Sequence, residues 1–405
     1  MVMKTKTIRK ILEYMLVTCI ILEFNTTYCV FPIIKRIAQI LPLLILILLI
    51  LLNNKRVPKT WGYIAIYMMG CIFPLLTIGN DKYVAYCFRY IMLLPLLWFY
   101  LSQQKETNIN AYLSLPLKLS NVITIIAIIS IVMWLLCSIM AIIPTTFMIP
   151  YDWAPGVYFI PSYYNIYFET QHTYLLGQQV WRNSGIFNEA PMHNMILCTA
   201  FAIEYFIRPQ KSKLRISILT FAIISTFTTT GQLFLIAITG WHIYKNIGKR
   251  YRPLLIIVTP IILGIIYIAG SMIMESKIKS GGEESVDLRS EDIAYCFEVG
   301  MQNPIMGIGI IPSENDMTWR GAQIGRSNSL FAVFARGGIY MLTLYISALV
   351  IIPILYYRKY KDSNWMMMMI CYFGIFTITI SYINLLTFLF LAWGLSNIDI
   401  KKYSN

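Results

Sequence analysis

Long apolar runs separated by short polar connections dominate the hydrophobic pattern of the chain. The runs 40–52 and 122–143 contain no charged residue. Longer stretches built around such runs reach the roughly 20 residues that a helix needs to cross about 30 Å of hydrocarbon. The pattern predicts an all-α polytopic membrane protein with about twelve transmembrane helices. We expect these helices over residues 8–28, 33–53, 61–79, 83–101, 119–143, 192–207, 214–229, 232–246, 253–274, 328–356, 365–382 and 385–398.

Two longer polar stretches divide the expected helices into three groups. The chain then consists of N-terminal transmembrane helices over 1–143, a first large loop over 144–190 and central transmembrane helices over 191–274. A second large loop follows over 275–326. The last group, over 327–405, contains the C-terminal transmembrane helices and a short tail. We expect the two large loops to carry the chemistry, because the rest of the chain is mostly apolar.

Basic residues gather in every second connection. The formal net charge is +14, yet only 13% of the 405 residues are charged, against about 25% in soluble domains. Lys and Arg concentrate at both ends of the chain and in alternate connections. The first large loop contains few basic residues, and in the second the basic residues are balanced by acidic ones. The positive-inside rule therefore predicts cytoplasmic termini and outward-facing large loops. This distribution accounts for the basic excess without nucleic acid as a partner. Lys35 and Arg36 are exceptions to this alternation, because they lie on the side where basic residues are not expected.

Residues 214–246 can form one long helix or a hairpin of two short helices. Both flanking segments, 208–215 and 245–252, are strongly basic. If both face the cytoplasm, the chain between them must cross the membrane an even number of times. Gly231 permits a turn and the preceding threonines can bond freed carbonyls. We therefore expect a break at 228–232.

The sequence motifs of nucleotide and metal chemistry are missing. The chain contains no P-loop and no G-x-G-x-x-G fingerprint. Its three histidines, His172, His193 and His242, show no ligand spacing with cysteines or paired acids. We therefore expect no cofactor and no metal.

The first large loop combines many aromatic residues with a single basic one, Arg182. The rings are typical of an interfacial aromatic belt or, alternatively, of a surface that stacks on sugars. Arg182 stands seven residues before Glu189, where a helix is expected to begin. Helix N-termini favour anions, so Arg182 is either a membrane-interface anchor or part of a phosphate cradle.

The second large loop contains a segment with helical spacing over 287–301. Ile293, Phe297 and Met301 form an apolar stripe, and Arg289 stands near the start of the helix. The spacing predicts a helix that lies on the membrane face. Most of the acids around Arg289 are interpreted as a solvated helix face; these acids are Glu283, Glu284, Asp287, Glu291 and Asp292.

Glycines and two more arginines follow this helix. Gly307 and Gly309 form a turn that allows close approach of another backbone. Arg326 opens the next transmembrane helix, and Arg336 lies about two turns inside it. An arginine at that depth is a candidate functional residue because burying it unpaired is costly.

An ordered set of these motifs resembles the O-antigen polymerase and O-antigen ligase superfamily. The resemblance covers about residues 181–345, and the set rather than any single motif is specific. It comprises Arg182, Gly185, Phe187, Glu189 and Pro191, then Thr229–Gly231, Arg289, Asn303, Pro304, Gly307, Gly309, and Ser327-Asn328-Ser329 before Gly337-Gly338.

The resemblance implies a metal-independent glycosyltransferase of the bacterial cytoplasmic membrane. It implies that polyprenyl-diphosphate-linked oligosaccharides serve as donor and acceptor, and that repeat units are joined on the outer face into O-antigen, capsular or exopolysaccharide. Membrane lipids and a chain-length regulator protein are the other expected partners. The residues that it assigns to the diphosphate are Arg182, Arg289, Arg326 and Arg336.

One departure from the family pattern bears on the catalytic base. The ligase branch typically has histidine where this chain has Ser327. This favours a polymerase over a ligase and leaves Glu189 and His193 as candidate bases. Each has a plainer alternative, since acidic residues cap helix starts and histidines often sit at interfaces. A ligase and a flippase or other polysaccharide transporter remain the alternative functions.

Overall fold

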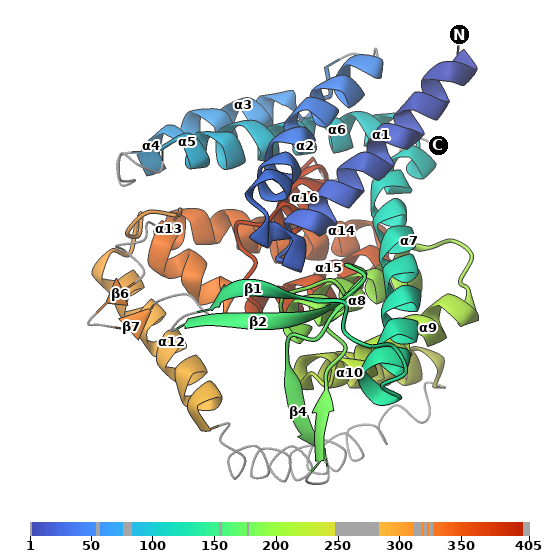
Figure 1. The fold of residues 1–405 in the computed structure, drawn as a ribbon. Coiled ribbons are helices and arrows are strands. Elements are labelled where there is room, and N and C mark those ends of the chain that lie inside the picture. Colours follow the sequence, from blue (N-terminus) through green and yellow to red (C-terminus); the bar gives the residue numbers. More distant parts are fainter. Residues whose placement is uncertain are drawn as a thin grey trace.

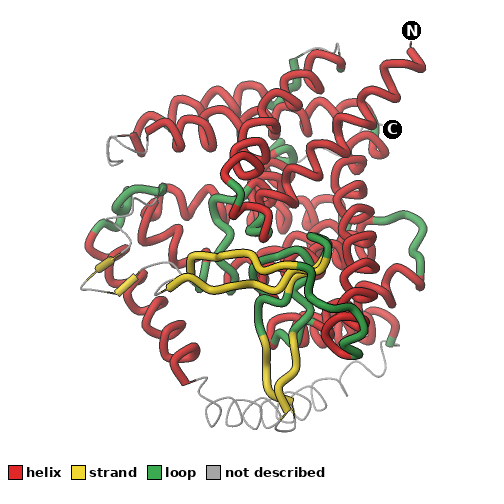
Figure 2. Tube along the Cα trace, viewed as in Figure 1, coloured by secondary structure: helices red, strands yellow, loops and turns green. Residues whose placement is uncertain are grey.

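The computed structural model describes residues 2–53, 57–75, 83–153, 156–175, 178–247, 283–311, 318–319, 322–323 and 327–399. It is mostly helical, with a small region of strands at one side of the helix bundle (Figures 1 and 2). Both chain ends lie at the same end of the bundle (Figure 1). The predicted helix over 253–274 and the side chains of Arg289 and Arg326 lie outside the described part.

The N-terminal half is a run of helices that begins with two long ones. Their bounds are α1 (Val2–Glu23), the 3-10 helix η1 (Thr27–Val30), α2 (Pro32–Leu52), α3 (Trp61–Gly70), α4 (Ile72–Leu75), α5 (Tyr83–Tyr86), the π-helix η3 (Cys87–Leu93), α6 (Leu94–Thr107), α7 (Ile109–Met133) and the π-helix η4 (Trp134–Ile139).

The C-terminal half contains shorter helices that form much of the buried core. Their bounds are α8 (Ala190–Ala202), the π-helix η5 (Ile203–Ile207), α9 (Lys213–Ser225), α10 (Thr229–Asn246), α12 (Glu283–Gln302), α13 (Ser329–Ile346), the π-helix η9 (Ser347–Ile351), α14 (Ile352–Tyr360), α15 (Ser363–Thr377) and α16 (Leu385–Leu395). Every residue of α16 is buried, so this helix forms the centre of the bundle.

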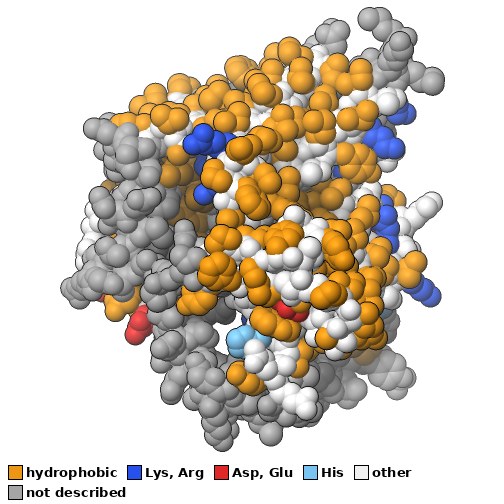
Figure 3. All heavy atoms as spheres, viewed as in Figure 1, with side chains coloured by type: hydrophobic (Ala, Val, Ile, Leu, Met, Phe, Trp, Pro, Cys, Tyr) orange, Lys and Arg blue, Asp and Glu red, His pale blue; other side chains and the backbone are white. Residues whose placement is uncertain are grey.

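Within the described residues, four helical segments are long and apolar enough to cross a membrane. They are Pro32–Leu52, Tyr83–Thr107, Ile109–Ile139 and Ser329–Tyr360. Other expected spans coincide with helices that are shorter or carry charged residues, such as α1 and α9. Many large apolar side chains of α2 are exposed, and Figure 3 shows a largely hydrophobic face. These features fit a membrane protein.

A break between 214 and 246 is confirmed, but it lies at residues 226–228 rather than at 228–232, and Gly231 belongs to the first turn of α10. Helix α9 ends at Ser225 and α10 begins at Thr229. Phe227 adopts a positive φ of 49° in the turn. The Thr228 hydroxyl then accepts a hydrogen bond from the Gly231 N–H at 3.3 Å, which caps α10.

The all-α expectation is wrong for the first large loop, which forms antiparallel strands. β1 (Phe147–Trp153), β2 (Gly156–Tyr163) and β3 (Tyr167–Phe168) make one sheet, and β4 (His172–Leu175) pairs with β5 (Gln178–Trp181). Ile149, Ile160 and Phe168 are buried together against Tyr28 of η1. Pro150 and Pro161 favour an irregular loop in sequence. Pro150 lies in the edge strand β1, where proline is tolerated, and Pro161 lies in β2 just before the residues that pair with β3. A third short pair is β6 (Thr318–Trp319) with β7 (Ala322–Gln323).

Helix α13 is broken at Gly338, where φ is 59° and ψ is −166°. The segment 303–309 crosses α13 at this break and replaces the interrupted helical hydrogen bonds. The N–H of Gly309 donates to the Arg336 carbonyl at 2.8 Å, and the N–H of Ile339 donates to the Pro304 carbonyl at 2.8 Å. Non-helical backbone at membrane depth needs such internal partners.

The close approach expected at the glycines of this crossing is confirmed for Gly307. A Cβ atom on Gly307 would lie 2.4 Å from the Arg336 carbonyl oxygen, and its φ is +67°. Helix α12, which was predicted over 287–301, packs its Cys296 and Val299 against Ala335 of α13. The side chains of the predicted stripe, Ile293, Phe297 and Met301, are exposed, although the Phe297 ring lies 6.1 Å from the Phe334 ring of α13.

Candidate functional site

The segment from Arg182 to Asn194 is fastened to the turn between α9 and α10. Arg182 Nε donates to the Thr226 carbonyl at 2.9 Å, and Asn183 Nδ2 donates to Ser225 Oγ at 2.9 Å. A Cβ atom on Gly231 would lie 2.2 Å from Asn194 Oδ1. Two motifs of the ordered set, 182–191 and 229–231, therefore meet at the start of α8.

Arg182 is half-buried and lines a cavity of about 480 Å³ beneath the strands. The aromatic residues Tyr158, Phe159, His172 and Trp181 line the same cavity. Its wall thus combines a guanidinium group with rings, which suits a sugar, and the Glu169 carboxylate lines it as well. The anchoring to Thr226 holds the guanidinium group at this position.

His193 is fully buried at the start of α8. Its Nδ1 donates to the Asn183 carbonyl at 3.0 Å, and its ring stacks on Phe187 with centroids 5.2 Å apart. Gly185 adopts a positive φ of 56°, and a Cβ atom there would lie 2.9 Å from the His193 ring. Nε2 has no partner within the described residues and no exposure. This geometry favours a supporting role for His193 over proton transfer to a sugar.

Glu189 occupies the N-cap position of α8, but its side chain makes no capping hydrogen bond. The neighbouring Asn188 donates from Nδ2 to the Tyr151 hydroxyl at 2.6 Å. Burial raises the pKa of the Tyr151 phenol, and the negative charge of Glu189 raises it further. The half-buried Glu189 carboxylate therefore lies near Tyr151, and the capping alternative loses its main support.

Asn188 and Tyr151 line a polar cavity of about 530 Å³ that we call the η1 pocket. Its charged lining residues are Glu23, Lys35 and Arg89, and Asn384 closes it from the loop before α16. The pocket thus draws on the end of α1, the start of α2, η3, β1 and the C-terminal part of the chain. Residues as far apart in sequence as Glu23 and Asn384 meet there.

Two amide groups of the η1 pocket lack partners within the described residues. They are Nδ2 of Asn384, which is 8% exposed, and Oδ1 of Asn188. One is a donor and the other an acceptor, and sugar hydroxyls can satisfy both. Arg89 Nη1 lies 3.2 Å from Glu23 Oε1. The other carboxylate oxygen of Glu23, Oε2, accepts a hydrogen bond from the Leu385 N–H at 3.0 Å. This ion pair fixes the Arg89 guanidinium group at the pocket wall.

Sequence reasoning did not identify the η1 pocket, although two signals pointed to it. Lys35 was an exception to the charge alternation, and the structure places it in the lining. Arg89 and Glu23 lie within predicted transmembrane helices, where ionisable residues mark functional sites. Both were treated as parts of apolar runs.

Asp292 was interpreted as part of a solvated helix face, and this is wrong. It is 2% exposed, and its Oδ2 accepts hydrogen bonds from Ser327 N at 2.9 Å, Ser327 Oγ at 2.7 Å and Asn328 Nδ2 at 3.0 Å. The carboxylate therefore holds the motif that begins α13. The Ser327 hydroxyl is therefore already the donor of a hydrogen bond to Asp292.

The structure places the predicted arginines in different surroundings. Arg336 is 1% exposed at the broken helix α13, and its Nη1 has no partner within the described residues. Arg182 lines the cavity beneath the strands instead. Arg289 belongs to α12, but its side chain, like Arg326, lies outside the described part. Convergence of these four residues on one diphosphate stays a prediction.

Comparison with protein-family models, with curated proteins and with solved structures found no match to this chain. Within the described residues, no group of three His, Cys, Asp or Glu side chains is placed to hold a metal ion.

Proposed function

We propose that the protein joins polyprenyl-diphosphate-linked oligosaccharide repeat units on the outer face of the bacterial cytoplasmic membrane. The observation that carries this proposal is the η1 pocket. It combines two unpaired amide atoms, the cations Lys35 and Arg89, of which Arg89 is paired with Glu23, and a neighbouring carboxylate, Glu189. Amides suit sugar hydroxyls, cations suit a diphosphate, and apolar helices suit a polyprenyl chain.

The chemistry requires one proton transfer and one leaving group. A hydroxyl of the acceptor sugar attacks the anomeric carbon of the donor, and the bond between that carbon and the diphosphate oxygen breaks. Glu189 takes the hydroxyl proton as general base. The polyprenyl diphosphate departs with its negative charge, which fixed guanidinium groups stabilise without a metal. Arg182, Arg289, Arg326 and Arg336 are the proposed diphosphate ligands of the C-terminal half.

The sugar lipids of a deletion strain test the function. Loss of a polymerase leaves single repeat units exposed on the outer face. Loss of a flippase keeps them inside, and loss of a ligase leaves long polymers on the lipid carrier. We expect the first pattern, and either of the others replaces the proposal with that function.

The proposed arginines are expected to be essential for polymer formation. Arg182→Ala or Arg289→Ala should abolish polymer at normal protein level, because charge on the leaving diphosphate loses its partner. Arg→Lys should be at least partly defective, since lysine lacks the bidentate fork. Immunoblots measure the protein level, and gels of the extracted polysaccharide measure the polymer. Arg358→Ala, on an exposed arginine of α14, is the control and should be silent. Normal polymer from both alanine variants removes these residues from the site.

The proposed twelve-helix topology places both large loops outside. In a cysteine-free version, single cysteines at Tyr158 and Glu291, which are both exposed, should react with an impermeant thiol reagent on whole cells. Cysteines at Lys211 and Lys359 should react only after the cells are opened. The opposite labelling pattern reverses the proposed orientation.

A further inference from the structure

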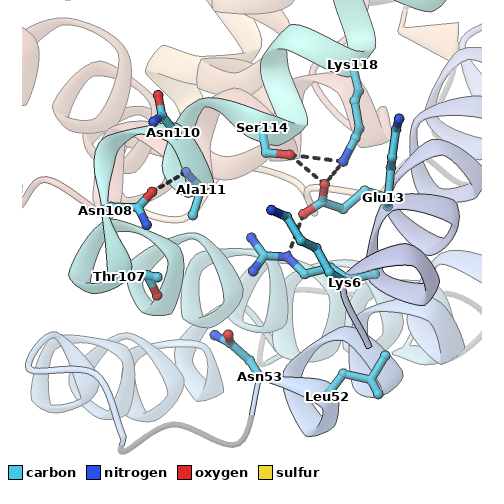
Figure 4. Close-up of a pocket in the computed structure, with 12 residues that line it drawn as sticks. Lys6, Glu13, Leu52, Asn53, Thr107, Asn108, Asn110, Ala111, Ser114 and Lys118 are labelled. Carbon is cyan, nitrogen blue, oxygen red and sulfur yellow. Dashed lines mark hydrogen bonds and ion pairs between the residues drawn. The ribbon is translucent and has the colours of Figure 1, made fainter. Parts of the chain in front are cut away.

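A second large cavity, of about 720 Å³, is lined partly by the start of α1, at the end of the bundle where Figure 1 places the N-terminus. Figure 4 shows its lining residues. It lies between α1, the end of α2, the end of α6 and the start of α7. Its charged lining residues are Lys6, Arg9, Lys10 and Lys118, with a single acid, Glu13. We call it the basic pocket. The proposed polymerase reaction makes no use of it.

Glu13 cannot neutralise these four cations. It is 1% exposed and accepts hydrogen bonds from Lys118 Nζ and from Ser114 Oγ at 2.6 Å, while Arg9 Nε lies 3.1 Å from its other oxygen. Figure 4 shows Lys118 and Ser114 converging on it. Within the described part of the chain, Lys6 and Lys10 form no ion pair. The lining therefore keeps three uncompensated positive charges.

The start of α7 adds to the positive potential of the basic pocket. Asn108 is its N-cap and accepts the Ala111 N–H at 2.8 Å, and both residues line the cavity. The N-terminal end of a helix carries a partial positive charge that favours phosphate. Four cations and a helix start together make a cavity suited to an anion.

An apolar groove of about 540 Å³ also includes a residue from the end of α2. It is lined by apolar side chains of α2, α3, η3 and α6, among them Ile50, Trp61 and Phe99. Ile50 lies two residues before Leu52 of the basic pocket, so the end of α2 borders both. Phe99 precedes Thr107 by eight residues, which is about 12 Å along α6. The groove thus runs away from the charged end, as an acyl chain runs away from its headgroup.

We propose that the basic pocket binds the phosphate of an anionic phospholipid and that the groove holds one of its acyl chains. Exposed apolar side chains of α1 beside the cations, Ile8 and Ile11, keep the entrance in contact with lipid. Basic pockets between membrane helices recognise anionic headgroups in this way. The occupant belongs to the leaflet at the end where both chain termini lie.

Native mass spectrometry of the purified full-length protein tests this site. The probes are dioleoyl phosphatidylglycerol, dioleoyl phosphatidylcholine and inorganic phosphate. We expect tight binding of phosphatidylglycerol alone. Each lysine near a membrane surface contributes about a fivefold preference for anionic lipid, so Lys6→Ala/Lys10→Ala should weaken binding about 25-fold. The matched control Lys59→Ala/Lys213→Ala removes two exposed lysines outside the pocket and should bind like wild type.

A groove variant separates a lipid from a free anion. Trp61→Ala should weaken binding of dioleoyl phosphatidylglycerol severalfold and leave the short-chain dihexanoyl lipid unchanged. Unaltered phosphatidylglycerol binding by Lys6→Ala/Lys10→Ala overturns the proposal. Displacement of the lipid by an equal concentration of inorganic phosphate also overturns the proposal, because the pocket then binds a free anion rather than a lipid.

Discussion

Replacing Gly338 by alanine is expected to abolish the folded protein. Its φ of 59° and ψ of −166° lie in a region that only glycine adopts readily. A Cβ atom would also lie 2.3 Å from the Ile305 carbonyl oxygen, within the segment that crosses the broken helix. Backbone strain alone reaches about 3 kcal/mol, and the contact with backbone leaves no flexible group to move. The yield of monodisperse protein in detergent and its thermal midpoint measure the loss.

Gly240→Ala is the matched control for Gly338→Ala. Gly240 lies in the regular helix α10, and nothing lies within 4 Å of a Cβ atom there. Alanine in a helix interior is favoured over glycine by about 0.5–1 kcal/mol, so this variant should be as stable as wild type or more stable. Equal yields and midpoints for the two variants contradict the proposed need for the break in α13.

Replacing Glu189 by glutamine is expected to lower polymerisation by about 10²–10⁴-fold while substrate binding is retained. Glutamine keeps the shape and an acceptor oxygen, but it cannot take the proton of the acceptor hydroxyl. Because glutamine has the same shape and size as glutamate, stability should change little. A reconstituted assay with purified lipid-linked repeat units measures the rate. Glu189→Asp, which keeps a displaced carboxylate, should recover part of the activity.

His193→Ala distinguishes a supporting histidine from a base. It removes the Nδ1 hydrogen bond to Asn183 and the stack on Phe187, so we expect a lower thermal midpoint. The fraction that stays folded should still polymerise, at a rate lowered only because the 183–187 turn has lost its contacts with His193. An active Glu189→Gln together with a stable, inactive His193→Ala transfers the role of base to His193.

Local patterns in the sequence determined where helices form. Apolar runs indicated helices in the described residues, but only four of these are long and apolar enough to cross a membrane, and α7 begins at Ile109 rather than at residue 119. The basic flanks indicated a break between α9 and α10, which lies at 226–228, just before the expected 228–232. Close backbone approach at Gly307 also followed from residue type, because only glycine leaves that space. These features depend on neighbours in the chain, so a linear pattern contains them.

Contacts between distant segments were decided by the tertiary structure alone. The strands of 147–181 gain stability from burial of Ile149, Ile160 and Phe168 against η1, which no local pattern encodes. Asp292 became a buried support for Ser327 because α12 packs on α13, although its neighbours in sequence are solvated acids. The η1 pocket joins residues 23–39 with 383–384, and charge patterning along the chain cannot show which distant amide or carboxylate will face Arg89. Composition and periodicity thus specify the helices, whereas long-range packing decides which polar side chains share a site.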